Sequence, residues 1–249
     1  MGAPLAGRCV SVRSLVEGER RQMFTLFARY YHETSWDQFH RDLCEKDEVI
    51  ILRDGAQQIR GFSTLRRLRI EIEGELHYGI FSGDTVVDEP FWGTKLLGRL
   101  FLWALFRERL RRPRSPLWWF LISKGYKTYL LMANNFPEHW PRYERVTPAG
   151  RRALIDGFAT ALFPERYRRE RGIVEALPKG GRLRAGVATI TEELFQSAPR
   201  VQFFAEQNPD WAQGDELACV ARMSWSMPLR YVLKALLGGR ASTALGERG

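Results

Sequence analysis

Apolar and aromatic residues recur at helical spacing near the start of the chain. In RRQMFTLFARYYHETSWDQFHRDLCEKD they stand mostly three or four positions apart, and the polar stretch ETSWDQ interrupts them. Residues at this spacing share one face of a helix, and such a break is where a new helix N-cap fits. The pattern predicts two helices, over about 16–32 and 35–45.

β-branched residues dominate the next segment, EVIILRDGAQQIRGFSTLRRLRIEIEGELHYGIFSGDTVV. It contains two turn signals, a DG pair after Arg53 and an EG pair at Glu73 and Gly74. Strands joined by short glycine turns form hairpins. We therefore expect an antiparallel meander of three or four strands.

The stretch IFSGDTVVDEPFWGTKLLG, from Ile80 to Gly98, leads from the last strand through a turn with one glycine into a helix. Thr94 to Arg112 carries apolar residues around most of its circumference, so we expect a helix that is buried on two sides. After RPRSP, the segment LWWFLISKG indicates a short apolar strand. Two strands that flank one helix in this way lie parallel in a sheet.

The second half of the chain alternates helical segments with proline-rich loops. Residues 148–200 indicate a basic helical and loop insertion, and RVQFFAEQNP and ELACVARMSW indicate two closing strands. A last amphipathic helix, MPLRYVLKALLGG, precedes a polar tail that we expect to be disordered. The predicted division is a core over 1–147, the insertion over 148–200, the closing hairpin and helix of the same domain over 201–238, and the tail over 239–249.

The composition is that of a globular protein with a substantial core: 249 residues, 45% hydrophobic and 27% charged. The formal charge is +9, mostly from arginine. A surface of that charge attracts phosphates, acidic carrier proteins, nucleic acid or anionic lipid, and charge alone does not select among them.

The three cysteines, Cys9, Cys44 and Cys219, are far apart and match neither a zinc motif nor a disulfide framework. This usage favours a reducing, cytoplasmic compartment and no metal. The longest apolar run, Leu100 to Phe106, is far shorter than the roughly 20 residues that cross a bilayer, so we expect no transmembrane segment.

The order of these elements resembles the GNAT superfamily of acyl-CoA-dependent N-acyltransferases over about residues 20–145 and 200–225. In that family a strand ends in a valine, and after a short turn an aromatic, a basic residue and a glycine open the next helix. Val87, Phe91 and Gly93 match the valine, aromatic and first glycine positions. The resemblance implies an α/β (α+β) fold with a mixed, mostly antiparallel central sheet and helices on both faces.

The same turn has a physical reason to bind a phosphate group. A glycine turn that feeds a helix leaves backbone N–H groups unpaired beside the positive end of the helix dipole. The sequence departs from the family pattern, because Trp92 replaces the basic residue and Lys95 and Leu97 replace the next two glycines. The cofactor-binding residues that we expect are Val86, Val87, Trp92, Gly93, Thr94 and Lys95.

The resemblance also implies a general base on or near the strand that precedes this turn. HYGIFSGDTVV has no glutamate in its middle, and alternation places Tyr78, Ser82 and Asp84 on one face and His77 on the other. A carboxylate within an apolar strand is costly unless it is paired or used, so Asp84 is the favoured base or amine anchor, with Ser82 beside it. A β-bulge or an Asx turn at residues 82–84 would explain the same three residues by a structural role.

In the family a tyrosine after the next strand often protonates the departing thiolate. Tyr126 and Tyr129 follow that strand here, and core packing accounts for either of them equally well. His32 and Glu33 lie between the first two helices, where substrate loops of the family often lie, and a surface helix end explains them as well. With Tyr78 they are the expected substrate-binding residues.

The aromatic residues near the predicted cleft are more numerous than an acetyl group requires. They are Trp92, Trp103, Trp118, Trp119, Phe120 and Trp140. Because each buried methylene contributes about 0.8 kcal/mol, a large apolar pocket would favour a long acyl chain or an aromatic substrate.

The resemblance implies an N-acyltransferase that moves an acyl group, long-chain on the aromatic evidence, from a thioester to an amine. The donor is acyl-CoA or the phosphopantetheine thioester of an acidic acyl carrier protein, and the acceptor is an amine-bearing small molecule or peptide. One alternative is an inactive GNAT-like sensor or scaffold that binds acyl thioesters. The other is a nucleic-acid or membrane-surface binder, suggested by RERLRRPR, RYRRERG and GGRLRAG, although no nucleic-acid-binding module is recognisable.

Overall fold

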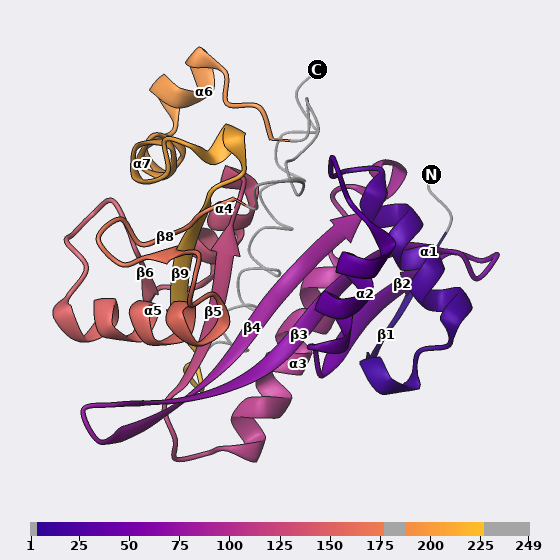
Figure 1. Ribbon diagram of the computed structural model, residues 1–249, viewed down its shortest axis with the longest axis horizontal. Coiled ribbons are helices and arrows are strands. Elements are labelled where there is room, and N and C mark those ends of the chain that lie inside the picture. Colours follow the sequence, from indigo (N-terminus) through magenta and orange to yellow (C-terminus); the bar gives the residue numbers. More distant parts are fainter. Residues whose placement is uncertain (1–3, 177–187, 227–249) are drawn as a thin grey trace, which may run out of the picture.

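One mixed sheet organises the part of the chain that this computed structural model describes, residues 4–176 and 188–226 (Figure 1). Its strands follow the order β1-β2-β3-β4-β5-β9-β8-β7, and β6 pairs with β9. The strands are β1 (Ala6–Ser11), β2 (Glu48–Arg53), β3 (Ile59–Ile72), β4 (Glu75–Val87), β5 (Leu117–Ser123), β6 (His139–Trp140), β7 (Tyr167–Arg168), β8 (Ile173–Val174) and β9 (Glu216–Arg222).

Helices cover both faces of this sheet. They are α1 (Glu17–Ala28), α2 (Trp36–Cys44), α3 (Leu96–Arg111), α4 (Tyr126–Asn135), α5 (Ala149–Leu162), α6 (Glu192–Ser197) and α7 (Pro199–Gln207), with short 3-10 turns at Val12–Ser14, Glu89–Phe91 and Trp211–Gln213. The predicted fold class, a mostly antiparallel mixed sheet between helical layers, is confirmed.

Alternating strand residues build the core on each face. Ile80 and Trp119 pack with α3 and α4, whereas Phe81 and Phe120 pack with α5 on the other face. At the β1 end of the sheet, side chains on one face of β2 and β3, such as Ile51 and Phe62, pack against α1 and α2. Each fully buried aromatic side chain contributes about 1.5–3 kcal/mol relative to an exposed one, so these layers fix the sheet firmly.

The parallel pair β4–β5 separates at one end. The pairing runs from Tyr78–Leu117 to Ser82–Leu121, although β4 continues to Val87 and β5 to Ser123. The two strands lie side by side near their start and point apart at their ends (Figure 1). Because α3 connects them across one face, their carboxyl ends open on the same edge, as the predicted crossover requires.

A β-bulge interrupts β4 at this opening. Ser63 of β3 pairs with Thr85 and Leu65 pairs with Ser82, so Thr64 alone stands opposite Gly83 and Asp84. The extra residue shifts the alternation of side chains beyond it. The expectation that Ser82 and Asp84 share one face of the strand is therefore wrong. The β-bulge that the sequence analysis named as an alternative for residues 82–84 is present.

Two elements differ from the sequence-based expectations. RVQFFAEQNP, expected as a strand, contains the helix α7, so the closing pair is a helix and a strand and not a hairpin. Pro199 occupies the first turn of α7, and Val201 and Phe204 bury one helical face. β1, which the sequence did not predict, forms an edge by pairing with β2.

α3 is buried on one side rather than two. Phe101, Ala104 and Leu105 are buried, whereas Trp103 and Leu110 are 56% and 51% exposed. The predicted insertion over 148–200 contributes α5, β7, β8 and α6, and β8 pairs with β9 of the main sheet. The domain boundaries stay a prediction, and the predicted last helix and tail lie outside the described residues.

A charged cluster ties the loop after β6 to α7. Glu144 pairs with Arg142 at 2.9 Å and with Arg200 at 3.6 Å. The hydrogen bond from Arg142 lowers the pKa of Glu144 from 4.5 to about 2. Since the folded pKa is depressed, the stabilisation is complete above pH 4.5 and disappears as the pH falls towards 2.

Glu144→Gln should therefore lower the free energy of unfolding at pH 6 and have a much smaller effect at pH 2, because about half of the wild-type carboxylate is protonated there. Urea unfolding of both proteins between pH 2 and 6 measures this difference. Glu170→Gln, at an exposed position, is the control. An equal loss at every pH would rule out the proposed linkage.

Candidate functional site

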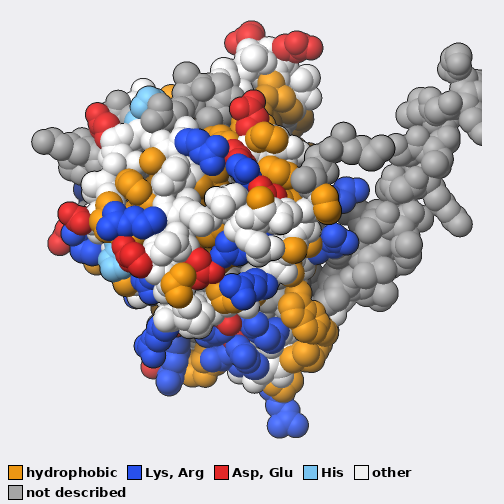
Figure 2. Space-filling model, turned by 90° about the vertical axis from the view of Figure 1, so that its right-hand side faces the viewer, with side chains coloured by type: hydrophobic (Ala, Val, Ile, Leu, Met, Phe, Trp, Pro, Cys, Tyr) orange, Lys and Arg blue, Asp and Glu red, His pale blue; other side chains and the backbone are white. Residues whose placement is uncertain are grey.

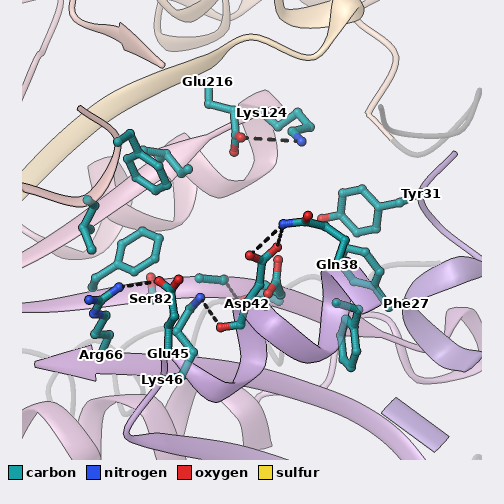
Figure 3. Close-up of a pocket in the computed structure, with 18 of the residues that line it drawn as sticks. Phe27, Tyr31, Gln38, Asp42, Glu45, Lys46, Arg66, Ser82, Lys124 and Glu216 are labelled. Atoms are coloured by element: carbon teal, nitrogen blue, oxygen red, sulfur yellow. Dashed lines mark hydrogen bonds and ion pairs between the residues drawn. The ribbon is translucent and has the colours of Figure 1, made fainter. Parts of the chain in front are cut away.

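A cavity of about 460 Å³ lies at the opening between β4 and β5. The bulge of β4, the end of β5, the α1–α2 connection and the end of α5 all contribute to its walls (Figure 3). Its charged lining residues are Glu33, Asp42, Glu45, Lys46, Arg66, Asp84, Lys124, Glu165, Arg166 and Glu216. The volume is in the range of small-molecule sites.

Asp84 enters this cavity from the bulge of β4. It forms no hydrogen bond or ion pair with any described residue, and its charge acts on Tyr31 and Asp42 across the cavity. Burial raises the pKa of Tyr31, and the charges of Asp84 and Glu216 add to that effect. Tyr31 therefore keeps its proton at neutral pH, facing an ionisable carboxyl group.

α2 supplies the second carboxylate of the cavity. The side-chain amide of Gln38 donates to both carboxylate oxygens of Asp42 at 2.9 Å, and Lys46 donates to the backbone carbonyl of Asp42 at 2.9 Å (Figure 3). Burial raises the pKa of Asp42, the hydrogen bond from Gln38 opposes the change, and the charge of Asp84 adds to it. The carboxylates of Asp42 and Asp84 thus face the same cavity, and the charge of one affects the other.

The far wall carries a paired charge cluster. Lys124, just beyond β5, lies 3.5 Å from Glu216, and Arg166 lies 3.7 Å from the same carboxylate. Lys124 also lies over the ring of Tyr31 at 5.6 Å. These contacts join β9 and the residues after α5 to the mouth of the cavity.

The β4–α3 junction lies at the end of the diverging strand. Gly93 adopts a φ of +84°, a conformation that favours glycine, and Lys95 caps α3 without a side-chain hydrogen bond. The Thr94 hydroxyl accepts the N–H of Leu96 at 3.3 Å. The N–H groups of Leu97 and the next residue, in the first turn of α3, have no acceptor in the described ranges.

The remaining junction residues have structural partners. The indole N–H of Trp92 donates to the carbonyl of Val87 at 2.8 Å, and Lys127 of α4 lies 5.2 Å from the Trp92 ring. Val86 is buried against the α1–α2 layer. Lys127 thus places a basic group beside the junction from α4, the helix that follows β5.

A buried carboxylate holds this junction in place. Asp88 accepts hydrogen bonds from Arg29 and Arg60 at 3.0 Å and from the Tyr30 hydroxyl at 3.2 Å. The Tyr30 oxygen in turn accepts the backbone N–H of Glu89 at 2.6 Å. The end of α1 and strand β3 therefore fix the turn that precedes α3.

The other predicted site residues are spread over the molecule. The Ser82 hydroxyl accepts the indole N–H of the buried Trp119 at 2.8 Å. Tyr129 is fully buried, and its hydroxyl donates to the carbonyl of Pro141 at 3.2 Å. Tyr126 begins α4 and packs against the α3–α4 core. Ser82 and Asp84 both line the cavity, although the bulge turns their side chains to opposite faces of β4, and neither Tyr126 nor Tyr129 is among the lining residues.

Of the predicted substrate-binding residues, Glu33 lines the cavity at a φ of +51°. His32 is exposed and Tyr78 lies at the start of the parallel pair, under the guanidinium of Arg112 at 4.5 Å; neither lines the cavity. The six aromatic residues cited for a large pocket also lie outside its lining. The cavity instead has Phe27, Tyr31, Phe39, Phe81 and Phe163.

Sequence reasoning missed the contribution of α2. Gln38 and Asp42 are four residues apart and therefore share one helical face, which was a readable signal. The contact between this face and the bulge of β4 is a long-range tertiary contact, which a local sequence pattern does not reveal. Among the described residues, no group of three or more His, Cys, Asp or Glu side chains is arranged to hold a metal ion, and no helix is long and apolar enough to cross a membrane.

No family model and no curated protein match this sequence. Solved structures overlap it in part. A GNAT family N-acetyltransferase from Escherichia coli, in complex with CoA, is 15% identical over 58% of this chain and 80% of that one, with a TM-score of 0.36. An acyl-CoA N-acyltransferase from Pseudomonas aeruginosa is 16% identical over 53% and 88%, with a TM-score of 0.40.

The NatC complex bound to Gag peptide and CoA is 15% identical over 54% of this chain and 85% of that one, with a TM-score of 0.40. The antiparallel meander and the parallel β4–β5 pair joined by one helix are the arrangement that the sequence predicted, and the separation of β4 and β5 at their ends is a further finding of the structure. The chain thus has the mixed, mostly antiparallel sheet that its resemblance to the GNAT superfamily predicted.

Proposed function

We propose that this protein is an N-acyltransferase that moves an acyl group from a pantetheine thioester to an amine. The observation that supports the proposal most strongly is the separation of β4 and β5 beyond Ser82 and Leu121, with a charged cavity and Asp84 at the opening. Separated strand ends leave backbone groups free for an extended ligand, and the cavity beside them has room for a second substrate.

The thioester donor would enter between the two strands. Its pyrophosphate would meet the free N–H groups at the start of α3, near the positive end of the helix dipole. Lys95 and Lys127 lie on the two sides of this entrance and would add positive charge. Trp92 stands where the family pattern has a basic residue, so Lys127 is the replacement that we propose.

The surface charge fits either of two donors. Figure 2 shows Lys and Arg side chains gathered toward the lower part of one face, beside hydrophobic side chains. Such a surface attracts the phosphates of coenzyme A and also an acidic acyl carrier protein. Both carry the same pantetheine thioester, so the chemistry of the site is the same.

The cavity contains residues that can accept and donate the protons that the reaction transfers. The acceptor ammonium loses a proton to Asp84, and the neutral amine attacks the thioester carbonyl. A carbon–nitrogen bond forms and the carbon–sulfur bond breaks. The thiolate takes a proton from a nearby acid, and the second proton that the attacking nitrogen loses as the amide forms restores that acid. Tyr31 keeps its proton and lines the cavity, which makes it a candidate for this acid beside Tyr126.

An apolar wall opposite the aspartates would receive the acyl chain. Phe81 and Phe163 meet edge to face with 5.8 Å between ring centroids, and Ile122 and Leu162 line the cavity beside them. Each methylene buried there contributes about 0.8 kcal/mol, so we propose that donors longer than acetyl are preferred.

Release of free thiol from acetyl-CoA and from longer acyl-CoA thioesters, with a panel of amines, tests the function. The proposal expects amine-dependent thiol release, faster with the longer chains. Calorimetry with coenzyme A identifies the sensor alternative, which binds without releasing thiol. The absence of binding together with steeply salt-dependent nucleic-acid binding would replace the proposal with the nucleic-acid alternative.

A further inference from the structure

Asp42 and Asp84 face the cavity without an ion pair to any residue of the described ranges. The basic side chains around them are engaged elsewhere: Arg66 pairs with Glu45 at 2.7 Å, and Lys124 pairs with Glu216 at 3.5 Å. Lys46 directs its ammonium to the backbone carbonyl of Asp42 at 2.9 Å. Two carboxylates therefore remain for a ligand to neutralise.

The lining as a whole is acidic in a basic protein. Six acidic and four basic residues line the cavity, which gives a formal charge of −2, while the chain carries +9. A cavity with an excess of one sign of charge concentrates ligands of the opposite sign. The cavity thus selects a cation, whereas the entrance beside α3 selects an anion.

The Asp42 side of the cavity is organised around its carboxylate. The amide of Gln38 holds both carboxylate oxygens at 2.9 Å, which fixes their orientation. Phe27 and Tyr31 stack beside it with 4.3 Å between ring centroids. Aromatic faces contact both methylene groups and ammonium groups favourably, so this wall suits a short hydrocarbon chain that ends in a cation.

A buried hydroxyl beside the bulge has no partner. Thr64 is 0% exposed, and its Oγ1 forms no hydrogen bond within the described chain. A Cβ atom built on Gly83 would lie 2.8 Å from this oxygen and 3.0 Å from Cε of Lys46. Gly83 and Lys46 line the cavity and Thr64 does not, so the hydroxyl lies on the cavity side of the bulge, directly beneath the lining.

We infer that the acceptor is a small diamine: one amine is acylated at Asp84 and the second ammonium is held by Asp42. This inference rests on the proposed acyltransferase function. The volume of about 460 Å³ fits a small molecule beside an acyl group. In the reaction only the amine at Asp84 gives up a proton and gains the acyl carbon, while the ammonium at Asp42 keeps its charge.

The decisive comparison uses two acceptors with the same four-carbon chain, 1,4-diaminobutane and butylamine, with one acyl-CoA donor. We expect kcat/KM for thiol release to be about 10- to 100-fold higher with the diamine, because one charge-assisted contact is added. Asp42→Asn should bring this ratio close to one, mainly by raising KM for the diamine. Asp37→Asn, an exposed carboxylate on the same helix outside the cavity, should leave the ratio as it is.

Calorimetry of 1,4-diaminobutane with the full chain, without donor, separates this inference from the proposed function. Binding that Asp42→Asn weakens supports the diamine site even if no thiol is released. Equal kcat/KM values for the two amines overturn the inference and leave the acyltransferase standing. Thiol release with lysine-containing peptides but with neither small amine also overturns it.

Discussion

Asp84→Asn should lower kcat for amine-dependent thiol release by about 100-fold or more. The substitution keeps the size of the side chain but removes the group that would take the proton of the acceptor amine, and general bases typically contribute 10²–10⁴. Binding of coenzyme A should stay unchanged, because the carboxylate lies on the cavity side of the bulge and not at the start of α3.

The control is Glu75→Gln, at an exposed position at the other end of the same strand. It changes the same charge on β4 without touching the cavity. Rates of Asp84→Asn within threefold of wild type, at equal folded fraction, would exclude Asp84 as the base. A loss of coenzyme A binding that matches the loss of rate would assign it a structural role instead.

Glu108→Gln should destabilise the protein by about 3 kcal/mol, the largest effect that we expect on stability. The Glu108 side chain is 3% exposed and accepts hydrogen bonds from Arg67 at 2.9 Å, Arg112 at 2.9 Å and Arg111. Burial alone would raise the pKa of Glu108, but the hydrogen bonds and charges of these arginines outweigh burial and lower it. Removing the central charge of a buried pair typically costs 3–5 kcal/mol, and the partly exposed arginines place this case at the lower end.

Urea denaturation at pH 7 measures the change. Arg111→Gln is the matched control, because it breaks one contact of the same cluster from its exposed side, where Arg111 is 51% exposed. That variant should lose less than about 1 kcal/mol. Equal losses in the two variants, or no loss in Glu108→Gln, would show that Glu108 is not the centre of the cluster.

Local signals in the sequence were sufficient for most of the fold. The helical spacing before residue 45, the glycine turns of the meander and the crossover through α3 all predicted elements that the structure contains. The strand predicted for RVQFFAEQNP was wrong because its β-branched and aromatic residues were counted without regard to their spacing. In α7, Val201 and Phe204 are three residues apart and follow Pro199, which is the signature of a helix start.

β1 escaped prediction because its sequence, AGRCVS, is short and polar. It exists through its pairing with β2, a long-range contact that no local pattern reveals. Trp103 shows the same limit on α3, since an apolar circumference did not lead to burial on both sides.

The candidate site was predictable only in the segment that carries the strand and the turn. Asp84 could be selected because a carboxylate in an apolar strand is energetically costly unless it is paired or has a function. Its partners could not, because Asp42 and Gln38 reach it only after α2 packs across the sheet, and the bulge redirects Asp84 to that side. Tyr129 shows the converse case: its position after β5 suggested an acid, and tertiary packing made it part of the core.

The central claim is that the opening between β4 and β5 binds a pantetheine thioester beside an amine site. Native mass spectrometry of the purified chain with coenzyme A and with acyl-CoA tests it most directly. We predict one bound thioester per chain, with acyl-CoA displacing coenzyme A and longer chains binding more tightly than acetyl. A chain that binds neither, while intact and folded, would contradict the account.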